Sequence, residues 1–93
     1  MRTLVIIPCY NEASRLETQA FLDFSKEHRH IHFLFVNDGS SDNTAKVLDS
    51  LALAAPDAIT AHHLERNQGK AEAVRQGFLR GFAMAPDVIG FLD

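Results

Sequence analysis

Short runs of apolar residues alternate along this chain with longer segments in which apolar residues recur every three or four positions. Residues 4–7 (LVII) form a continuous apolar run that ends at Pro8, which is typical of a parallel strand buried on both faces. Similar runs predict further strands at residues 31–36, 59–64 and 88–92. The pattern therefore indicates four short strands separated by helical segments.

The segments between the strands carry signals for three helices. Ser14, with Glu17 three residues later, matches a capping box and predicts that the first helix begins there. Asp42 or Asn43 can cap the second helix. The third helix is expected at residues 71–84.

In the third expected helix, both bulky apolar residues and glycines recur at a spacing of four. Val74, Phe78 and Phe82 recur at a spacing of four and predict its apolar face. Gly77 and Gly81 lie at adjoining positions and would allow the helix to pack closely on the sheet. The order β-α-β-α-β-α-β, with connections of this length, predicts an α/β fold: an open, mostly parallel sheet with right-handed crossovers and helices on its faces.

Composition narrows the class of protein. Of the 93 residues, 46% are apolar and 23% are charged, as in an ordinary globular domain of this size. A net charge of -3 gives no indication of a nucleic-acid partner. Cys9 is the only cysteine, so no internal disulfide can form. Residues 4–7 are too short to cross a bilayer, which takes about 20 residues, and we expect a cytoplasmic location.

Polar residues follow each expected strand at the point where the strand ends. They occupy residues 8–12, 37–42 and 65–70, and Asp93 follows the last strand. Ligands of open α/β sheets bind outside the carboxyl ends of the strands. Neither G-x-G-x-x-G nor a P-loop pattern is present, which argues against a dinucleotide fold and excludes a P-loop. Carboxylates that accept hydrogen bonds and can hold a divalent metal, together with Lys70 for phosphate, suit a nucleoside diphosphate.

Four strings in this sequence resemble successive blocks of the family-2 glycosyltransferases. They are VIIPCYNE at residues 5–12, VNDGSSDNT at 36–44, NQGKAEAVRQG at 67–77 and GFLD at 90–93. The first string resembles the polyprenyl- and dolichyl-phosphate mannosyl- and glucosyltransferases in particular. The resemblance implies the N-terminal half of a GT-A fold, with its Rossmann-like order of strands and helices.

The resemblance also implies roles for individual residues. Pro8, Tyr10 and Glu12 would line the nucleoside pocket while Asn11 holds their loop, Asp38 would bind the edge of the base, and Asp42 would steady its own loop. Gly69 and Lys70 would lie against the nucleotide. The implied nucleotide-sugar-binding set is Pro8, Tyr10, Asn11, Glu12, Asp38, Gly39, Gly69, Lys70 and Asp93. Asp93 aligns with the first aspartate of a D-x-D motif, which coordinates Mg or Mn on the donor diphosphate.

Residues 1–93 are accordingly expected to be the nucleotide-sugar-binding portion of a glycosyltransferase domain, truncated at Asp93. In full length the enzyme would transfer a hexose from a nucleotide sugar to a polyprenyl phosphate or glycan, with inversion, at the cytoplasmic face of a membrane. No residue of the fragment is assigned a catalytic role, and the fragment is expected to be inactive.

Two alternatives stay open at this point: a nucleotide-binding module without catalysis, and another α/β nucleotide enzyme such as a nucleotidyltransferase. With its later elements missing, the strand at residues 88–92 would present an apolar edge to solvent. We therefore expect the fragment to associate as a homodimer.

Overall fold

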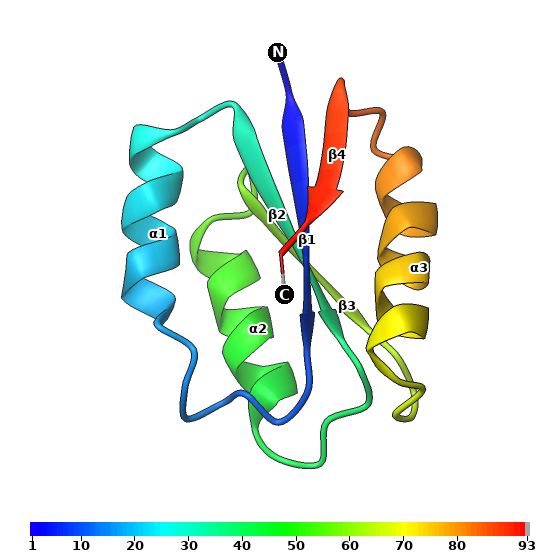
Figure 1. Ribbon diagram of the computed structural model, residues 1–93. Coiled ribbons are helices and arrows are strands. Elements are labelled where there is room, and N and C mark those ends of the chain that lie inside the picture. Colours follow the sequence, from blue (N-terminus) through cyan, green and yellow to red (C-terminus); the bar gives the residue numbers. More distant parts are fainter. Residues whose placement is uncertain (93) are drawn as a thin grey trace.

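Four parallel strands form one sheet, with two helices on one face and one helix on the other (Figure 1). The computed structural model describes residues 1–92. The strands are β1 (Thr3–Cys9), β2 (Ile31–Asn37), β3 (Ile59–His63) and β4 (Val88–Phe91), in the spatial order β3-β2-β1-β4. The helices are α1 (Thr18–Glu27), α2 (Thr44–Ala54) and α3 (Lys70–Phe82). The predicted α/β architecture and order of elements are confirmed.

The register of the sheet brings the carboxyl ends of β1, β2 and β3 level with one another. Cys9 at the end of β1 pairs with Asn37 at the end of β2, and Asn37 pairs in turn with His63 at the end of β3. The turns that leave these three strands therefore start from the same edge of the sheet. The polar strings that the sequence places after the strands meet there.

Successive side chains of each strand point to opposite faces of the sheet, so the core has two layers. Leu4 and Ile6 of β1 join Leu34 and Val36 of β2 beneath α3. Phe33 and Phe35 of β2 point to the opposite face, where they pack with residues of α1 and α2. Both faces of β1 and β2 are thus covered, which is why these strands read as continuous apolar runs.

Small residues of α3 let its backbone approach the sheet. Ala73, Gly77 and Gly81 are the buried residues of this helix and recur at a spacing of four. Phe82, in contrast, is 61% exposed. The predicted close approach at the glycines is confirmed. The face that we assigned to Val74, Phe78 and Phe82 lies beside this contact, since Phe78 packs against the core but is only partly buried. Bulky aromatic rings would hold the helix away from the sheet, whereas small residues allow it to sit closer.

The first helix begins later than the capping signal predicts. Residues after β1 form a turn in which the backbone N–H groups of Arg15 and Leu16 both donate to the carbonyl of Glu12. Helix α1 then starts at Thr18, and the residue before it, Glu17, makes no side-chain capping bond. The capping box expected at Ser14 is therefore wrong. Within residues 1–92, no helix is both long enough and apolar enough to span a membrane.

Replacing Gly77 with alanine tests the contact between α3 and the sheet. An added Cβ would lie 2.5 Å from Cγ2 of Ile6 and 3.1 Å from Cγ2 of Val36. Overpacking of a core costs about 1–3 kcal/mol, of which improved helix propensity returns up to about 1 kcal/mol. We expect Gly77→Ala to lower the free energy of unfolding in urea by about 1–2 kcal/mol.

Gly90→Ala is the matched control, because no atom of residues 1–92 lies within 4 Å of an added Cβ at this position in β4. Its effect should stay within about 0.5 kcal/mol. Equal stability of the Gly77→Ala variant and the unsubstituted chain would contradict the close packing of α3.

Candidate functional site

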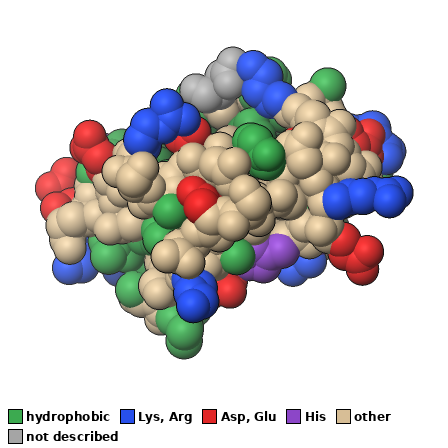
Figure 2. Space-filling model, turned by 90° about the horizontal axis from the view of Figure 1, so that it is seen from below, with side chains coloured by type: hydrophobic (Ala, Val, Ile, Leu, Met, Phe, Trp, Pro, Cys, Tyr) green, Lys and Arg blue, Asp and Glu red, His purple; other side chains and the backbone are tan. Residues whose placement is uncertain are grey.

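A hollow of about 310 Å³ lies at the carboxyl ends of β1 and β2. It is lined by residues of three loops: Pro8, Cys9, Tyr10, Glu12, Asp38, Asn67, Gly69 and Lys70. Figure 2 views this end of the sheet and shows a surface made largely of backbone and uncharged polar atoms, with a few acidic and basic side chains among them. The structure thus brings together six of the nine predicted residues, all except Asn11, Gly39 and Asp93. Asp93 lies outside the described residues.

The carboxylate of Asp38 joins two of the loops. It is only 3% exposed. Its Oδ1 accepts a hydrogen bond from the backbone N–H of Gln68 at 2.8 Å, and its Oδ2 accepts from the backbone N–H of Gly69 and the side chain of Asn67, each at 3.0 Å. The charge of this buried group is therefore compensated by three donors from the loop that precedes α3.

Gly39 allows this close approach of the loops. Its φ of +61° lies in the left-handed region, which glycine adopts without steric cost. A Cβ at this position would overlap the backbone of Arg66 and Asn67. Gly39 therefore shapes the site through its backbone and not through contact with the hollow.

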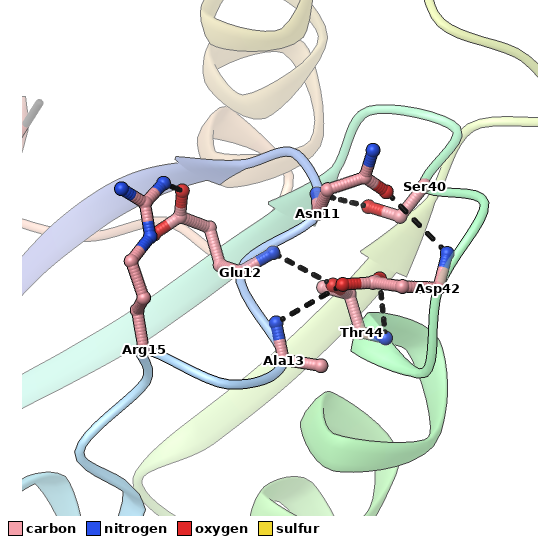
Figure 3. Close-up of polar contacts among 7 residues, drawn as sticks. All are labelled: Asn11, Glu12, Ala13, Arg15, Ser40, Asp42 and Thr44. Carbon is pink, nitrogen blue, oxygen red and sulfur yellow. Dashed lines mark hydrogen bonds and ion pairs between the residues drawn. The ribbon is translucent and has the colours of Figure 1, made fainter.

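Asn11 fastens the loop after β1 to the loop after β2 (Figure 3). Its backbone has a φ of +52°, and its N–H donates to Oγ of Ser40 at 3.0 Å. Its Oδ1 accepts from the backbone N–H groups of Ser41 at 2.9 Å and Asp42 at 3.4 Å. Asn11 thus holds the loop that carries Tyr10 and Glu12, as its predicted role requires, without lining the hollow itself.

Asp42 and Thr44 continue this attachment. Thr44 donates its backbone N–H to Oδ1 of Asp42 at 2.9 Å, and its Oγ1 accepts from the backbone N–H of Glu12 at 2.9 Å. Asp42 also accepts from the backbone N–H of Ala13. The Thr44 hydroxyl and then these backbone donors keep the pKa of Asp42 below its usual value. Asn43, the residue directly before α2, makes no side-chain capping bond. The side chain that accepts a backbone N–H at the start of α2 is therefore Asp42.

The titratable groups at the hollow differ in what they can do. Burial, followed by the nearby charge of Glu12, raises the pKa of the Cys9 thiol to about 12. This thiol stays protonated at neutral pH and cannot act as a thiolate nucleophile. Glu12 forms an ion pair with Arg15. Both oxygens of the Asp38 carboxylate already accept hydrogen bonds, whereas the ion pair of Glu12 involves only its Oε1.

Metal binding rests on Asp93, a predicted ligand outside the described part of the chain. Among residues 1–92, no three histidine, cysteine, aspartate or glutamate side chains cluster as metal ligands would. The assignment of Mg or Mn to Asp93 therefore stays a prediction.

Two residues can contact a ligand in the hollow directly. Tyr10 is 47% exposed, so much of its ring is available to a ligand. Lys70 is the first residue of α3 and follows Gly69, whose φ is +97°. The N-terminus of a helix favours anions because its backbone N–H groups point outward. Aromatic, cationic and backbone-donor groups thus surround one space.

Three residues at this edge were not among the predicted site residues. Asn67 lines the hollow and also donates to the carbonyl and carboxylate of Asp38. Cys9 forms part of its wall. Asn37 is 4% exposed and accepts the backbone N–H of Ser40 with its Oδ1 at 3.1 Å. Asn67 and Asn37 lie within the strings at residues 67–77 and 36–44, so position in the motif was the available signal.

A larger hollow of about 490 Å³ lies near the C-terminal ends of α1 and α2. Its walls include Gln19, Lys26, Arg29 and residues 54–58. It lies at the opposite end of the strands, where none of the predicted binding residues occur. Its larger volume alone is no reason to prefer it as the binding site over the hollow at the carboxyl ends.

Known proteins show the same sequence pattern. The model of the family described as "Glycosyl transferase family 2" matches residues 4–93. The polyprenol monophosphomannose synthase of Mycolicibacterium smegmatis is 38% identical over 95 residues, which cover 99% of this chain and 34% of that protein. A dolichyl-phosphate beta-glucosyltransferase of Trichomonas vaginalis is 35% identical over 85 residues, covering 83% of this chain and 25% of that protein.

Solved structures share the fold. A mannosyltransferase from Pyrobaculum calidifontis, in complex with GDP-Man and Mn²⁺, superposes with a TM-score of 0.69 at 27% identity, over 85% of this chain and 24% of that one. The TarS protein of S. aureus gives a TM-score of 0.66 at 24% identity, over 100% of this chain and 27% of that one, which supports the fold alone. These neighbours have the GT-A fold, so the predicted fold class is confirmed. With a family match over nearly its whole length, the chain belongs to glycosyl transferase family 2.

Proposed function

We propose that this chain binds the nucleoside diphosphate part of a nucleotide sugar in the hollow at the carboxyl ends of β1 and β2. The observation that carries the proposal is the assembly of three loops around one space: the buried Asp38 carboxylate joins the loops after β2 and before α3, and Asn11 joins the loop after β1 to the loop after β2. This hollow offers an exposed tyrosine ring and lies at the start of a helix, next to a lysine. These groups match a base, a sugar-phosphate chain and its negative charge.

In this proposal each loop contributes to one part of the ligand. Pro8, Tyr10 and Glu12 line the nucleoside end, while Gly69 and Lys70 lie against the phosphates. Asp38 accepts three hydrogen bonds and a carboxylate has about four acceptor positions, so its capacity to bind the edge of a base is at most one further bond. Its larger contribution is to keep the loop at residues 67–69 in place.

The chain spans about a third of the first curated relative and less of the others reported above. The activity of a longer protein is therefore a further proposal: transfer of a hexose, with inversion, from a nucleotide sugar to a polyprenyl-phosphate acceptor at the cytoplasmic face of a membrane. This proposal is supported by the sequence identity of 38% and 35% to proteins named as polyprenol and dolichyl-phosphate transferases. The 93 residues alone are expected to bind the nucleotide without transferring sugar.

We also propose that Asp93 contributes to holding Mg or Mn, in line with the Mn²⁺ named in the mannosyltransferase complex. A divalent ion in that place would neutralise charge on the leaving diphosphate. The residues of the described loops would bind and orient the nucleotide, which positions the anomeric carbon for attack by an acceptor.

Calorimetry with GDP and UDP tests the proposed function. We expect one of them to bind at millimolar concentration or below, and Asp38→Ala to weaken binding by about 1.5–3 kcal/mol, because a charged acceptor is lost and the 67–69 loop is released. Binding of neither nucleotide would contradict the site.

Asp57→Ala serves as the control for this measurement. Asp57 borders the other large hollow, at the opposite end of the strands, and its loss should leave nucleotide affinity unchanged. Equal binding by the Asp38→Ala and Asp57→Ala variants would also contradict the assignment. Unfolding curves of both variants show whether each remains folded.

The homodimer is proposed on the basis of the edge at β4. In the sheet order β4 has only one neighbouring strand, and Val88 and Phe91 are 45% and 51% exposed. An unpaired apolar edge is a template for pairing with another chain. Light scattering across a concentration series should show self-association that Phe91→Lys abolishes.

Leu53→Lys is the matched control, since Leu53 is 83% exposed on α2 and does not belong to this edge. It should leave the self-association intact. A monomer at every concentration, or equal loss of association in both variants, would contradict an interface at β4.

A further inference from the structure

A line of hydrogen bonds runs from the surface of α2 to the turn that follows β2. The carboxylate of Asp49 on α2 contacts Nε2 of His63 at 2.8 Å. Nδ1 of His63 contacts Nδ2 of Asn37 at 3.0 Å, and Oδ1 of Asn37 accepts the backbone N–H of Ser40 at 3.1 Å. Asp49 and His63 do not line the hollow, yet their contacts end at one of its loops.

The two ends of this line determine how each group within it is oriented. The Ser40 N–H is a backbone donor, so Asn37 must present its oxygen to Ser40 and its NH₂ group to His63. Nδ1 of His63 must then carry a lone pair, which leaves the proton of the neutral ring on Nε2. That proton faces the Asp49 carboxylate, which can only accept. Every donor meets an acceptor in this one arrangement.

Burial makes the orientation of Asn37 consequential. Asn37 is 4% exposed, so a rotated amide could not exchange its lost partners for water. Rotation would place its NH₂ group against the Ser40 N–H, and two buried donors would face each other. The Ser40 hydroxyl also accepts the backbone N–H of Asn11 at 3.0 Å, and this contact is visible in Figure 3. A shift of Ser40 would therefore reach the loop that carries Tyr10 and Glu12.

We infer that His63 and Asp49 are positioning residues for the nucleotide site: they orient the Asn37 amide, which holds the turn at residues 38–40 in its binding geometry. The effect on ligand binding rests on the proposed function, whereas the effect on the turn does not. His63 acts by offering an acceptor at Nδ1. Asp49 acts by drawing the proton of the neutral ring to Nε2.

A charged His63 would break this arrangement. Protonation adds a hydrogen at Nδ1, which then opposes the NH₂ group of Asn37. The titratable groups next to His63 in the described contacts are Asp49 on α2 and His62 on its own strand, while β2 contributes the uncharged Asn37. Acid should therefore release Asn37, while the charged ring still donates to Asp49 from Nε2.

Two substitutions of His63 distinguish the effect of its hydrogen-bond acceptor from the effect of its bulk. In His63→Asn, the amide oxygen can occupy the place of Nδ1 and still accept from Asn37, but it has no proton to gain. In His63→Leu, the acceptor is lost. His62→Leu is the control, because His62 is the neighbouring histidine and takes no part in the line of hydrogen bonds from Asp49 to Ser40.

The primary measurement is hydrogen exchange of the Ser40 amide by NMR in the protein without ligand, corrected for the intrinsic dependence of exchange on pH. Loss of the acceptor in His63→Leu should speed exchange about tenfold, the effect of one weakened buried bond. His63→Asn and His62→Leu should exchange like the unsubstituted chain at neutral pH. At acid pH, where an imidazole is protonated, the unsubstituted chain should lose protection at Ser40, and His63→Asn should not.

Calorimetry with GDP under the same conditions links the turn to the site. GDP affinity should fall about tenfold in His63→Leu and recover in His63→Asn. If GDP does not bind, UDP takes its place in the same measurement; if neither nucleotide binds while Ser40 exchange follows the expected pattern, the nucleotide assignment fails and the positioning role stands. Full protection of Ser40 in His63→Leu would overturn the inference. If His63→Leu does not fold, matching pH profiles of the unsubstituted chain and His63→Asn would overturn it.

Discussion

The buried carboxylate of Asp38 is the interaction on which the arrangement of this end of the molecule depends. Asp38 follows β2 directly, and its carboxylate holds the loop between β3 and α3. The N–H groups of Gln68 and Gly69 and the amide of Asn67 all donate to its oxygens. Those donors precede the first turn of α3, so the same contact sets where that helix begins. Without the carboxylate, the backbone N–H groups of Gln68 and Gly69 would lose their acceptor, and Asn67 would keep only the Asp38 carbonyl.

A second attachment complements the first on the other side of the hollow. Asn11 and Thr44 join the loop after β1 to the loop after β2 through backbone groups of both. The loop at residues 38–44 therefore lies between two partners and is held by both. Side chains exposed to a ligand, such as Tyr10, stand on loops whose backbones are already satisfied, which is the condition for a site that is formed before the ligand arrives.

The sheet and α3 supply the support for this edge. Gly77 and Gly81 place the helix close to Leu4, Ile6 and Ile89, so that its N-terminal end meets the Asp38 loop at a defined distance. Membership of glycosyl transferase family 2 accounts for the strings that the sequence shares with longer enzymes. Their spacing follows from the fold, because each of the first three strings includes residues that follow the carboxyl end of one strand, and these ends lie at the same edge of the sheet.

The sequence by itself determined the order of the elements, the parallel sheet and the loops that gather at one edge, since these follow from hydrophobic period and crossover handedness. It also indicated the close approach at Gly77 and Gly81. It misplaced the start of α1, because the turn at Glu12 depends on its attachment to Thr44, 32 residues away. Only the tertiary structure showed that Asp38 holds a loop and that His63 reaches Asn37. Both depend on strand register, which pairs residues distant in the chain and leaves no local pattern.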